Sequence, residues 1–181
     1  MQKPSVVIEK LISAIDILCS RVGKSAAWLT TVMVIVICVD VVIRYVFSTS
    51  KAWMTEFEWH MFALVFLIGA AYTFAHDAHV RVDLFYGRLS EKRKALINIT
   101  GIVGLLLPWC LIVIRSSYKY AYNSFAIRES SPDPGGLSAR YIIKFAIVLG
   151  FILLAMQAVS VLLKSVGVLR GTRKVIFDPK D

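Results

Sequence analysis

The sequence predicts an all-α membrane protein with four transmembrane helices, amphipathic helices at the membrane surface, and both termini in the cytoplasm. Of the 181 residues, 57% are hydrophobic and only 18% are charged. Crossing the hydrocarbon layer of a bilayer takes about 20 mostly apolar residues. Four runs are long enough, at about residues 26–47, 57–76, 95–116 and 141–163. We therefore expect a single four-span membrane domain over residues 1–181.

The basic residues predict the orientation of these spans. Of 21 lysines and arginines, 14 lie before the first span, between the second and third, or after the fourth. Cytoplasmic loops carry an excess of basic residues, so we expect both termini inside and a basic cytoplasmic tail at 164–181. The basic residues border the apolar runs and form no stripe interleaved with aromatics. The expected surroundings are therefore a lipid bilayer, and a nucleic-acid partner is not expected.

Residues 5–22 predict an amphipathic helix ahead of the first span. Its apolar residues recur at helical spacing, namely Ile8, Leu11, Ile12, Ile15, Leu18, Cys19 and Val22. Such a helix is typical of a segment lying on the membrane surface. Gly23 offers a bend before the span, which favours a separate surface helix. The alternative is a cytoplasmic extension of the first span.

The first span carries one pair of opposite charges, Asp40 and Arg44. The two residues are four apart and therefore share a helical face. A helix starting near Ser25 places Asp40 about 22 Å along its axis, towards the outer surface. We expect a structural ion pair here rather than a proton relay.

The second span has two unlike borders. Its first border is acidic and aromatic, with Trp53, Glu56, Glu58 and Trp59. Its other border is basic and amphipathic, with His79, Arg81 and Asp83 as candidate anchors at the inner surface. Between them lie the small residues Gly69, Ala70 and Ala71, which suit close helix packing. That packing involves either this chain alone or another membrane subunit.

The third span is longer than a bilayer requires. Helical signals run from Lys92 to Phe125, about 50 Å if fully helical, against a hydrocarbon layer of about 30 Å. The helix therefore tilts strongly or projects from the outer surface. Pro108 removes a backbone donor and predicts a kink.

The sequence offers little for catalysis, and we expect no catalytic, metal or substrate site and no cofactor. A haem-binding or other accessory subunit of a membrane redox complex is the alternative to weigh. Haem commonly takes histidines from two helices. All three histidines, His60, His76 and His79, belong to the second span or its exit. A metal site at His76, Asp77, His79 and Asp83 competes with a simple polar helix exit, which we favour.

Several segments, in order and spacing, resemble the small (DctQ-like) membrane subunit of tripartite ATP-independent periplasmic (TRAP) transporters. They are residues 44–47 (RYVF), Trp53, Glu56, 67–71 (LIGAA), 79–84 (HVRVDL) and 133–137 (DPGGL). Aromatic residues occupy positions around Trp59 where many members carry a basic residue, so no arginine-specific contact is carried over there.

The resemblance implies a scaffold in the bacterial or archaeal inner membrane, with two partners besides the lipid. One is a large membrane subunit that carries the substrate and sodium sites. The other is a periplasmic substrate-binding protein, usually for organic acids. Candidate contacts with the binding protein are Trp53, Glu56, Glu58, Trp59 and Asp133. For Glu56 and Glu58 the alternative is a pair of solvated charges at a helix start.

Overall fold

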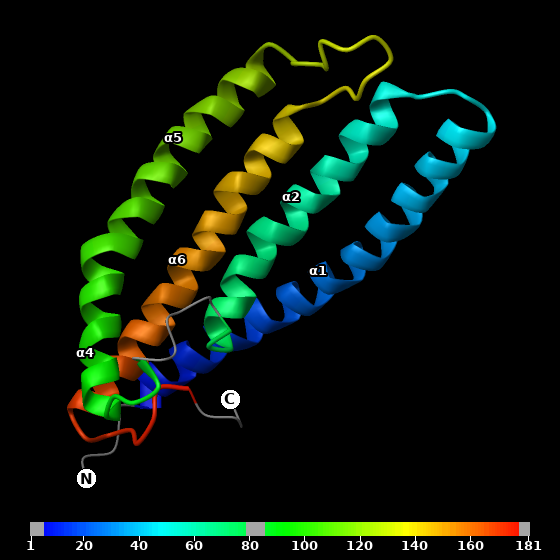
Figure 1. Ribbon diagram of the computed structural model, residues 1–181. Coiled ribbons are helices and arrows are strands. Elements are labelled where there is room, and N and C mark those ends of the chain that lie inside the picture. Colours follow the sequence, from blue (N-terminus) through cyan, green and yellow to red (C-terminus); the bar gives the residue numbers. More distant parts are fainter. Residues whose placement is uncertain (1–5, 79–85, 178–181) are drawn as a thin grey trace.

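The computed structural model describes residues 6–78 and 86–177, which form a bundle of helices without a β-strand. The helices are α1 (Val6–Val46), α2 (Ala52–Ala75), α4 (Glu91–Gly101), α5 (Leu107–Ala126) and α6 (Tyr141–Leu169). A π-helical turn, η1 (Ile102–Leu106), joins α4 to α5. The start of α1 and the end of α6 lie at one end of the bundle, here called the terminal end (Figure 1). The opposite end carries links 47–51 and 127–140 and is called the loop end.

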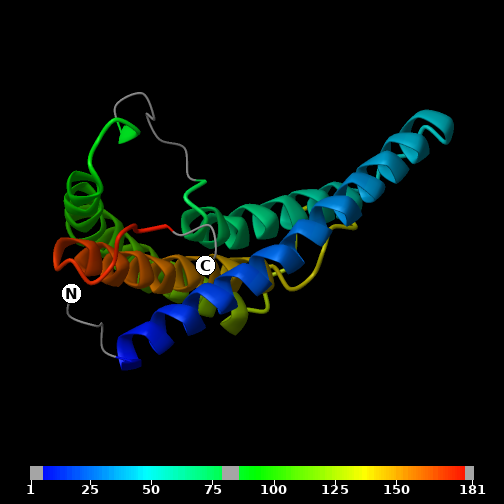
Figure 2. The ribbon, with the colours of Figure 1, turned by 90° about the horizontal axis from the view of Figure 1, so that it is seen from below.

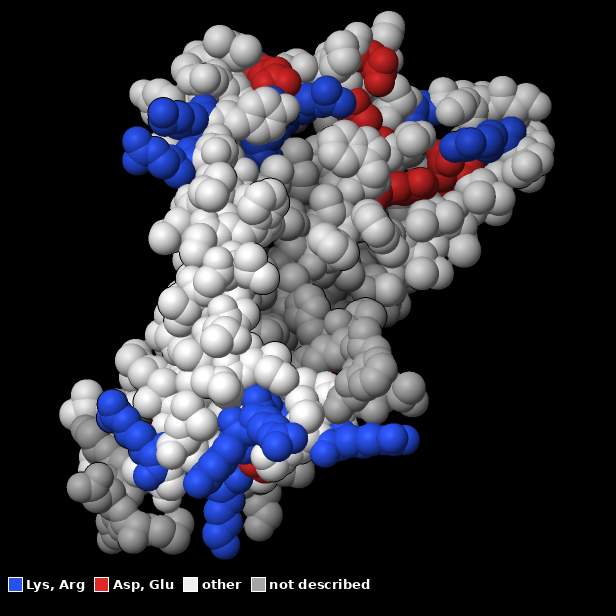
Figure 3. Space-filling model, turned by 60° about the vertical axis from the view of Figure 1, so that its left-hand side comes forward, with Lys and Arg blue, Asp and Glu red and all other residues white. Residues whose placement is uncertain are grey.

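The four predicted spans are confirmed as four helices long and apolar enough to cross a membrane. They are Val6–Val46, Ala52–Ala75, the continuous stretch Glu91–Ala126, and Tyr141–Leu169. On the face shown in Figure 3, charged side chains gather at the two ends of the molecule. This distribution matches an apolar middle within the bilayer. The orientation of the termini stays a prediction.

The separate surface helix expected at residues 5–22 is wrong, because α1 continues without a break from Val6 to Val46. Its 41 residues are about 60 Å long, roughly twice the hydrocarbon thickness. The alternative of an extended first span therefore holds. The last turns of α1 stand away from the other helices in two perpendicular views (Figures 1 and 2). There Tyr45 is 80% and Phe47 68% exposed.

Gly23 marks a helix crossing rather than a bend. A Cβ placed on it would lie 2.5 Å from Cδ2 and 2.6 Å from Cγ of Tyr72 on α2. The missing side chain therefore lets α1 and α2 approach closely. Gly150 does the same between α6 and α2, where an added Cβ would meet Leu67 Cβ at 2.9 Å.

The long third span follows its sequence prediction with one local change. Pro108 lacks an amide hydrogen, and its ring crowds the carbonyl group four residues earlier. The helix accommodates this at η1, the π-helical turn that ends two residues before Pro108. The 36 residues from Glu91 to Ala126 remain one continuous helical stretch.

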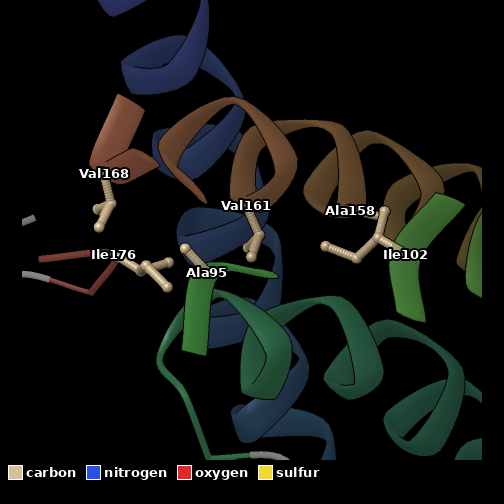
Figure 4. Packing of buried hydrophobic residues seen from close by; sticks show 6 residues of the cluster. All are labelled: Ala95, Ile102, Ala158, Val161, Val168 and Ile176. Atoms are coloured by element: carbon tan, nitrogen blue, oxygen red, sulfur yellow. The ribbon is translucent and has the colours of Figure 1, made fainter. Parts of the chain in front are cut away.

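α6 lies between α5 and α2 (Figure 1) and carries more buried residues than any other described helix. One cluster of buried side chains joins α4, η1, α6 and the following segment (Figure 4), comprising Ala95, Ile102, Ala158, Val161, Val168 and Ile176. The tail expected at 164–181 is therefore corrected in part. α6 extends to Leu169, and the chain then folds back so that Ile176 is buried against the bundle.

A buried polar network joins α1 to α6 near the terminal end. Lys164 is 2% exposed, and its Nζ lies 2.7 Å from Asp16 Oδ2. Asp16 Oδ1 accepts hydrogen bonds from Gln157 Nε2 at 3.0 Å and from Ser160 Oγ at 2.7 Å. Lys164 was expected in the basic tail at 164–181. The network instead fixes the position of α1 along α6.

The close crossing at Gly23 predicts that two glycine-to-alanine substitutions on different helices change the stability of the chain to different extents. Gly23→Ala forces Tyr72 to move and should cost about 1–3 kcal/mol, as overpacking does. Gly69→Ala is the matched control, since a Cβ there meets nothing within 4 Å. The thermal midpoint of the detergent-solubilised chain should fall for Gly23→Ala only. Equal midpoints would contradict the close crossing.

The Asp16–Lys164 pair predicts strong coupling between two substitutions. Asp16→Asn removes the carboxylate charge that lies 2.7 Å from the buried Lys164 ammonium group, which should cost about 3–5 kcal/mol. The double variant Asp16→Asn/Lys164→Met should recover much of that loss. Unfolding midpoints of the two single variants and the double variant give the coupling free energy. Additive effects would show that the pair does not hold the helices together.

Candidate partner-contact surface

The loop end carries the residues expected to meet a partner, and the structure divides them into exposed and occupied groups. Trp53 and Trp59 at the start of α2 are 41% and 42% exposed. Asp133 is exposed in the link between α5 and α6. Glu58 is half-buried, whereas Glu56 is buried. These side chains therefore do not form one acidic surface.

Glu56 holds the 127–140 link and is not available as a surface charge. Its carboxylate is 4% exposed and accepts hydrogen bonds from the Ser131 hydroxyl group, from Leu137 N–H at 2.6 Å and from Arg140 Nη2 at 3.0 Å. Both ideas for this residue, a direct partner contact and a solvated helix-start charge, are therefore corrected. The charge is stable at this depth because three donors satisfy the carboxylate and one of them is the positively charged Arg140 guanidinium group.

The link is an ordered loop closed on itself. Ser131 N–H donates to Leu137 O at 3.0 Å, and Arg140 N–H donates to Glu129 O at 3.0 Å. Gly136 is required by close contact, because an added Cβ would lie 2.5 Å from Ser131 Cβ and 2.9 Å from Glu56 Oε2. The loop therefore presents Asp133 on a fixed backbone.

A second ion pair closes the base of the loop. Lys144 is buried at the start of α6, and its Nζ lies 2.5 Å from Glu129 Oε2. The same ammonium group lies 3.9 Å from the centre of the Tyr120 ring on α5, a cation–π contact. The hydrogen bond from Lys144 holds the pKa of Glu129 below its ordinary value. The loop is thus tied to α2 through Glu56 and to α6 through Lys144.

The Asp40–Arg44 pair expected within the first span is present, with Arg44 Nη2 2.5 Å from Asp40 Oδ2. Asp40 is buried, and Glu58 on α2 lies within electrostatic range of both residues. Asp40 Oδ1 and Glu58 Oε1 are buried without a hydrogen-bond partner among the residues that the structure describes. The pair therefore belongs to a polar contact between α1 and α2.

The small residues of α2 serve two different surfaces. Ala71 is buried in a cluster with Ile15, Cys19 and Leu153, so it packs within this chain. Gly69 faces open space, because an added Cβ would meet nothing within 4 Å. Packing within the chain thus accounts for Ala71 but not for Gly69.

The remaining candidates give no site that the structure can describe. His79, Arg81 and Asp83, the expected inner anchor, lie outside the described residues. Within residues 6–78 and 86–177, no three His, Cys, Asp or Glu side chains gather in a way that could hold a metal ion. His60 lies on α2 and His76 directly follows its last residue, each with its Nδ1 at a backbone oxygen one turn earlier.

Sequence reasoning missed the partners of the charged residues rather than the residues themselves. Glu56 and Arg140 are 84 residues apart, and Asp16 and Ser160 are 144 apart. Local periodicity carries no information on such pairings. One signal was available, since a lysine or glutamate bordering an apolar run must either reach water or find a counter-ion.

These features define a small multi-pass helical membrane protein whose buried charges are neutralised within the chain. The family model for tripartite ATP-independent periplasmic transporters, DctQ component, matches residues 33–167. The chain therefore belongs to the DctQ family, a component of TRAP transporters. No curated protein gives a significant match to the chain.

The anchoring role of Glu56 predicts a local loosening of the loop. Glu56→Gln removes the charge and one acceptor, which should cost about 1.5–3 kcal/mol for charge-assisted bonds. Hydrogen exchange at the Leu137 amide, which donates to Glu56, should accelerate by at least about tenfold. Glu58→Gln is the control and should leave that amide protected. Equal protection in both variants would contradict the anchor.

Proposed function

We propose that this chain is the scaffold subunit of a TRAP transporter in the inner membrane of a bacterium or archaeon. It braces the immobile part of the large transport subunit and helps to dock a periplasmic binding protein. The complex would take up organic acids with sodium, the substrate and sodium sites lying on the large subunit. Membership of the DctQ family supports the transporter setting.

The pairing of buried charges is the observation that carries the scaffold role. Four charged side chains are buried in the described part of the chain, namely Asp40, Glu56, Lys144 and Lys164. Each forms a salt bridge within the chain. Charges in apolar surroundings are costly unless paired, and pairs between different segments fix those segments relative to one another. Glu56, Lys144 and Lys164, whose partners lie on other segments, thus hold a frame together.

Two surfaces of this frame suit a large membrane partner. The open space at Gly69 allows a partner helix to approach the backbone of α2 closely. The last turns of α1 stand apart from the bundle, and apolar and aromatic side chains are exposed there, among them Tyr45 and, directly after the helix, Phe47. A partner helix along either surface would bury area that this chain leaves uncovered.

The loop end suits the contact with a binding protein. Glu56 and Lys144 hold the 127–140 loop from two sides, so Asp133 is presented with little loss of conformational freedom on binding. Trp53 and Trp59 are exposed nearby on α2, and tryptophan is enriched at the centres of protein interfaces. Glu56 holds the loop that carries Asp133 and does not itself contact the binding protein.

Copurification and uptake test the proposal together. The tagged chain, expressed with the large subunit and binding protein of its own system, should copurify with the large subunit. Proteoliposomes holding both membrane subunits should accumulate the binding protein's ligand under a sodium gradient, and those lacking this chain should not. Uptake by this chain alone, or a Soret absorption band in the purified chain, would contradict the proposal.

The open face at Gly69 gives a sharper prediction. Gly69→Leu should leave the thermal midpoint of the isolated chain within about 1 °C, because the side chain enters open space. It should lower the yield of the two-subunit complex severalfold, since a leucine there separates the packed helices. Gly104→Leu is a matched control on η1, also with nothing within 4 Å. A normal yield for Gly69→Leu, or equal losses for both, would contradict packing at this face.

A further inference from the structure

An exposed cationic stripe runs along α5 towards the loop end. It consists of Arg115, Tyr118, Lys119 and Tyr122, defined here as the α5 stripe. These residues are spaced three and four apart and therefore share one helical face. All four are exposed, Tyr118 at 53% and Tyr122 at 54%. On the face shown in Figure 3, both basic and acidic side chains lie at this end of the molecule.

The charge of the α5 stripe is not neutralised within the described part of the chain. α5 itself contains no aspartate or glutamate. Of the acidic residues at the same end, Asp40, Glu56 and Glu129 are already paired with Arg44, Arg140 and Lys144. Glu58 and Asp133 form no salt bridge with a described residue, so they are not paired with the stripe. Neither Arg115 nor Lys119 forms a salt bridge with any described residue. The stripe therefore offers positive charge to something outside this chain.

The tyrosine rings of the stripe are held in place before anything binds. The Tyr118 ring packs edge-on against Phe145 of α6, with ring centres 6.2 Å apart. It also stacks with Tyr122 at 6.3 Å. One side of each ring is thus fixed while about half of the residue stays exposed. Rigid tyrosines beside arginine are typical of protein interfaces, because little side-chain freedom is lost on binding.

The length of the stripe favours a protein over lipid headgroups. If the hydrocarbon layer begins near Ala95, about 30 Å of helix ends near Arg115. From Arg115 to the end of α5 at Ala126, the helix rises about 16 Å more. The headgroup layer is only about 5–8 Å thick on each side. For an untilted helix placed in this way, the Tyr122 end of the stripe stands about 10 Å beyond Arg115 and so beyond the headgroups.

We propose that the α5 stripe is a docking surface for an acidic face of the periplasmic binding protein. This inference rests on the proposed function and deepens it, since it adds to the contact at Asp133 a second, positively charged contact that an acidic part of the soluble partner meets. The stripe guides the binding protein electrostatically, and the two tyrosines provide the desolvated contact. Such steering weakens as ionic strength rises.

Charge reversal on the stripe tests this inference. The complete transporter carrying Arg115→Glu/Lys119→Glu is reconstituted in nanodiscs of phosphatidylcholine and titrated with its own binding protein. The dissociation constant should rise by at least about tenfold, with a weaker salt dependence. Arg115→Gln/Lys119→Gln should give an intermediate value. Lys92→Glu/Arg93→Glu, an equal change at exposed positions of α4 at the terminal end, should bind like the unaltered complex.

The possible outcomes distinguish failure of the proposal for the α5 stripe from failure of the proposed docking function. If the charge-reversed variant binds with a dissociation constant within about twofold of the unaltered complex at all salt concentrations, the proposal for the α5 stripe is wrong. The proposed docking function is not affected by that result. Loss of tightly bound anionic lipid from the reversed variant, seen by native mass spectrometry with unchanged docking, identifies a lipid surface and also overturns the proposal for the stripe. Failure of the unaltered complex to bind the protein at all refutes the docking function and the stripe together.

Discussion

The salt bridge between Asp16 and Lys164 is the contact on which the arrangement of α1 depends. α1 is 41 residues long, and its final turns stand away from the bundle, so most of its buried residues lie in its first half. That half is held by the bonds of Asp16 to α6, by the small cluster around Cys19, and by the crossing at Gly23. In apolar surroundings an ion pair has few competing partners, so it specifies register as well as contact. The direction in which the far end of α1 projects follows from this one position.

The same principle organises the loop end. Glu56 is buried at the start of α2 and collects donors from the 127–140 loop, while Lys144 holds the base of that loop through Glu129. A 14-residue connection between two long helices would otherwise lose much entropy on becoming ordered. Charge-assisted bonds at two points offset that cost. The loop therefore behaves as part of the helical frame.

Local sequence patterns predicted the helices but not the contacts between them. The four spans follow from hydropathy and length, and the Asp40–Arg44 pair from a spacing of four within one helix. Gly23 was read as a bend because sequence alone does not show Tyr72 facing it. Glu56 and Lys164 were placed at surfaces because the residues that neutralise them are far away in the chain. Each error concerns a long-range partner, which helical periodicity does not encode.

Because the buried charges are paired within the chain, a different set of residues is available for contact with partners. Asp16, Glu56, Lys144 and Lys164 are committed to holding segments together, so altering them changes the frame before it changes any contact. Gly69, the projecting end of α1 and the α5 stripe have no comparable role inside the described chain. Internal and external functions thus fall on different residues. Such a separation suits a subunit that must keep its shape while a soluble partner binds and leaves and a neighbouring membrane subunit moves.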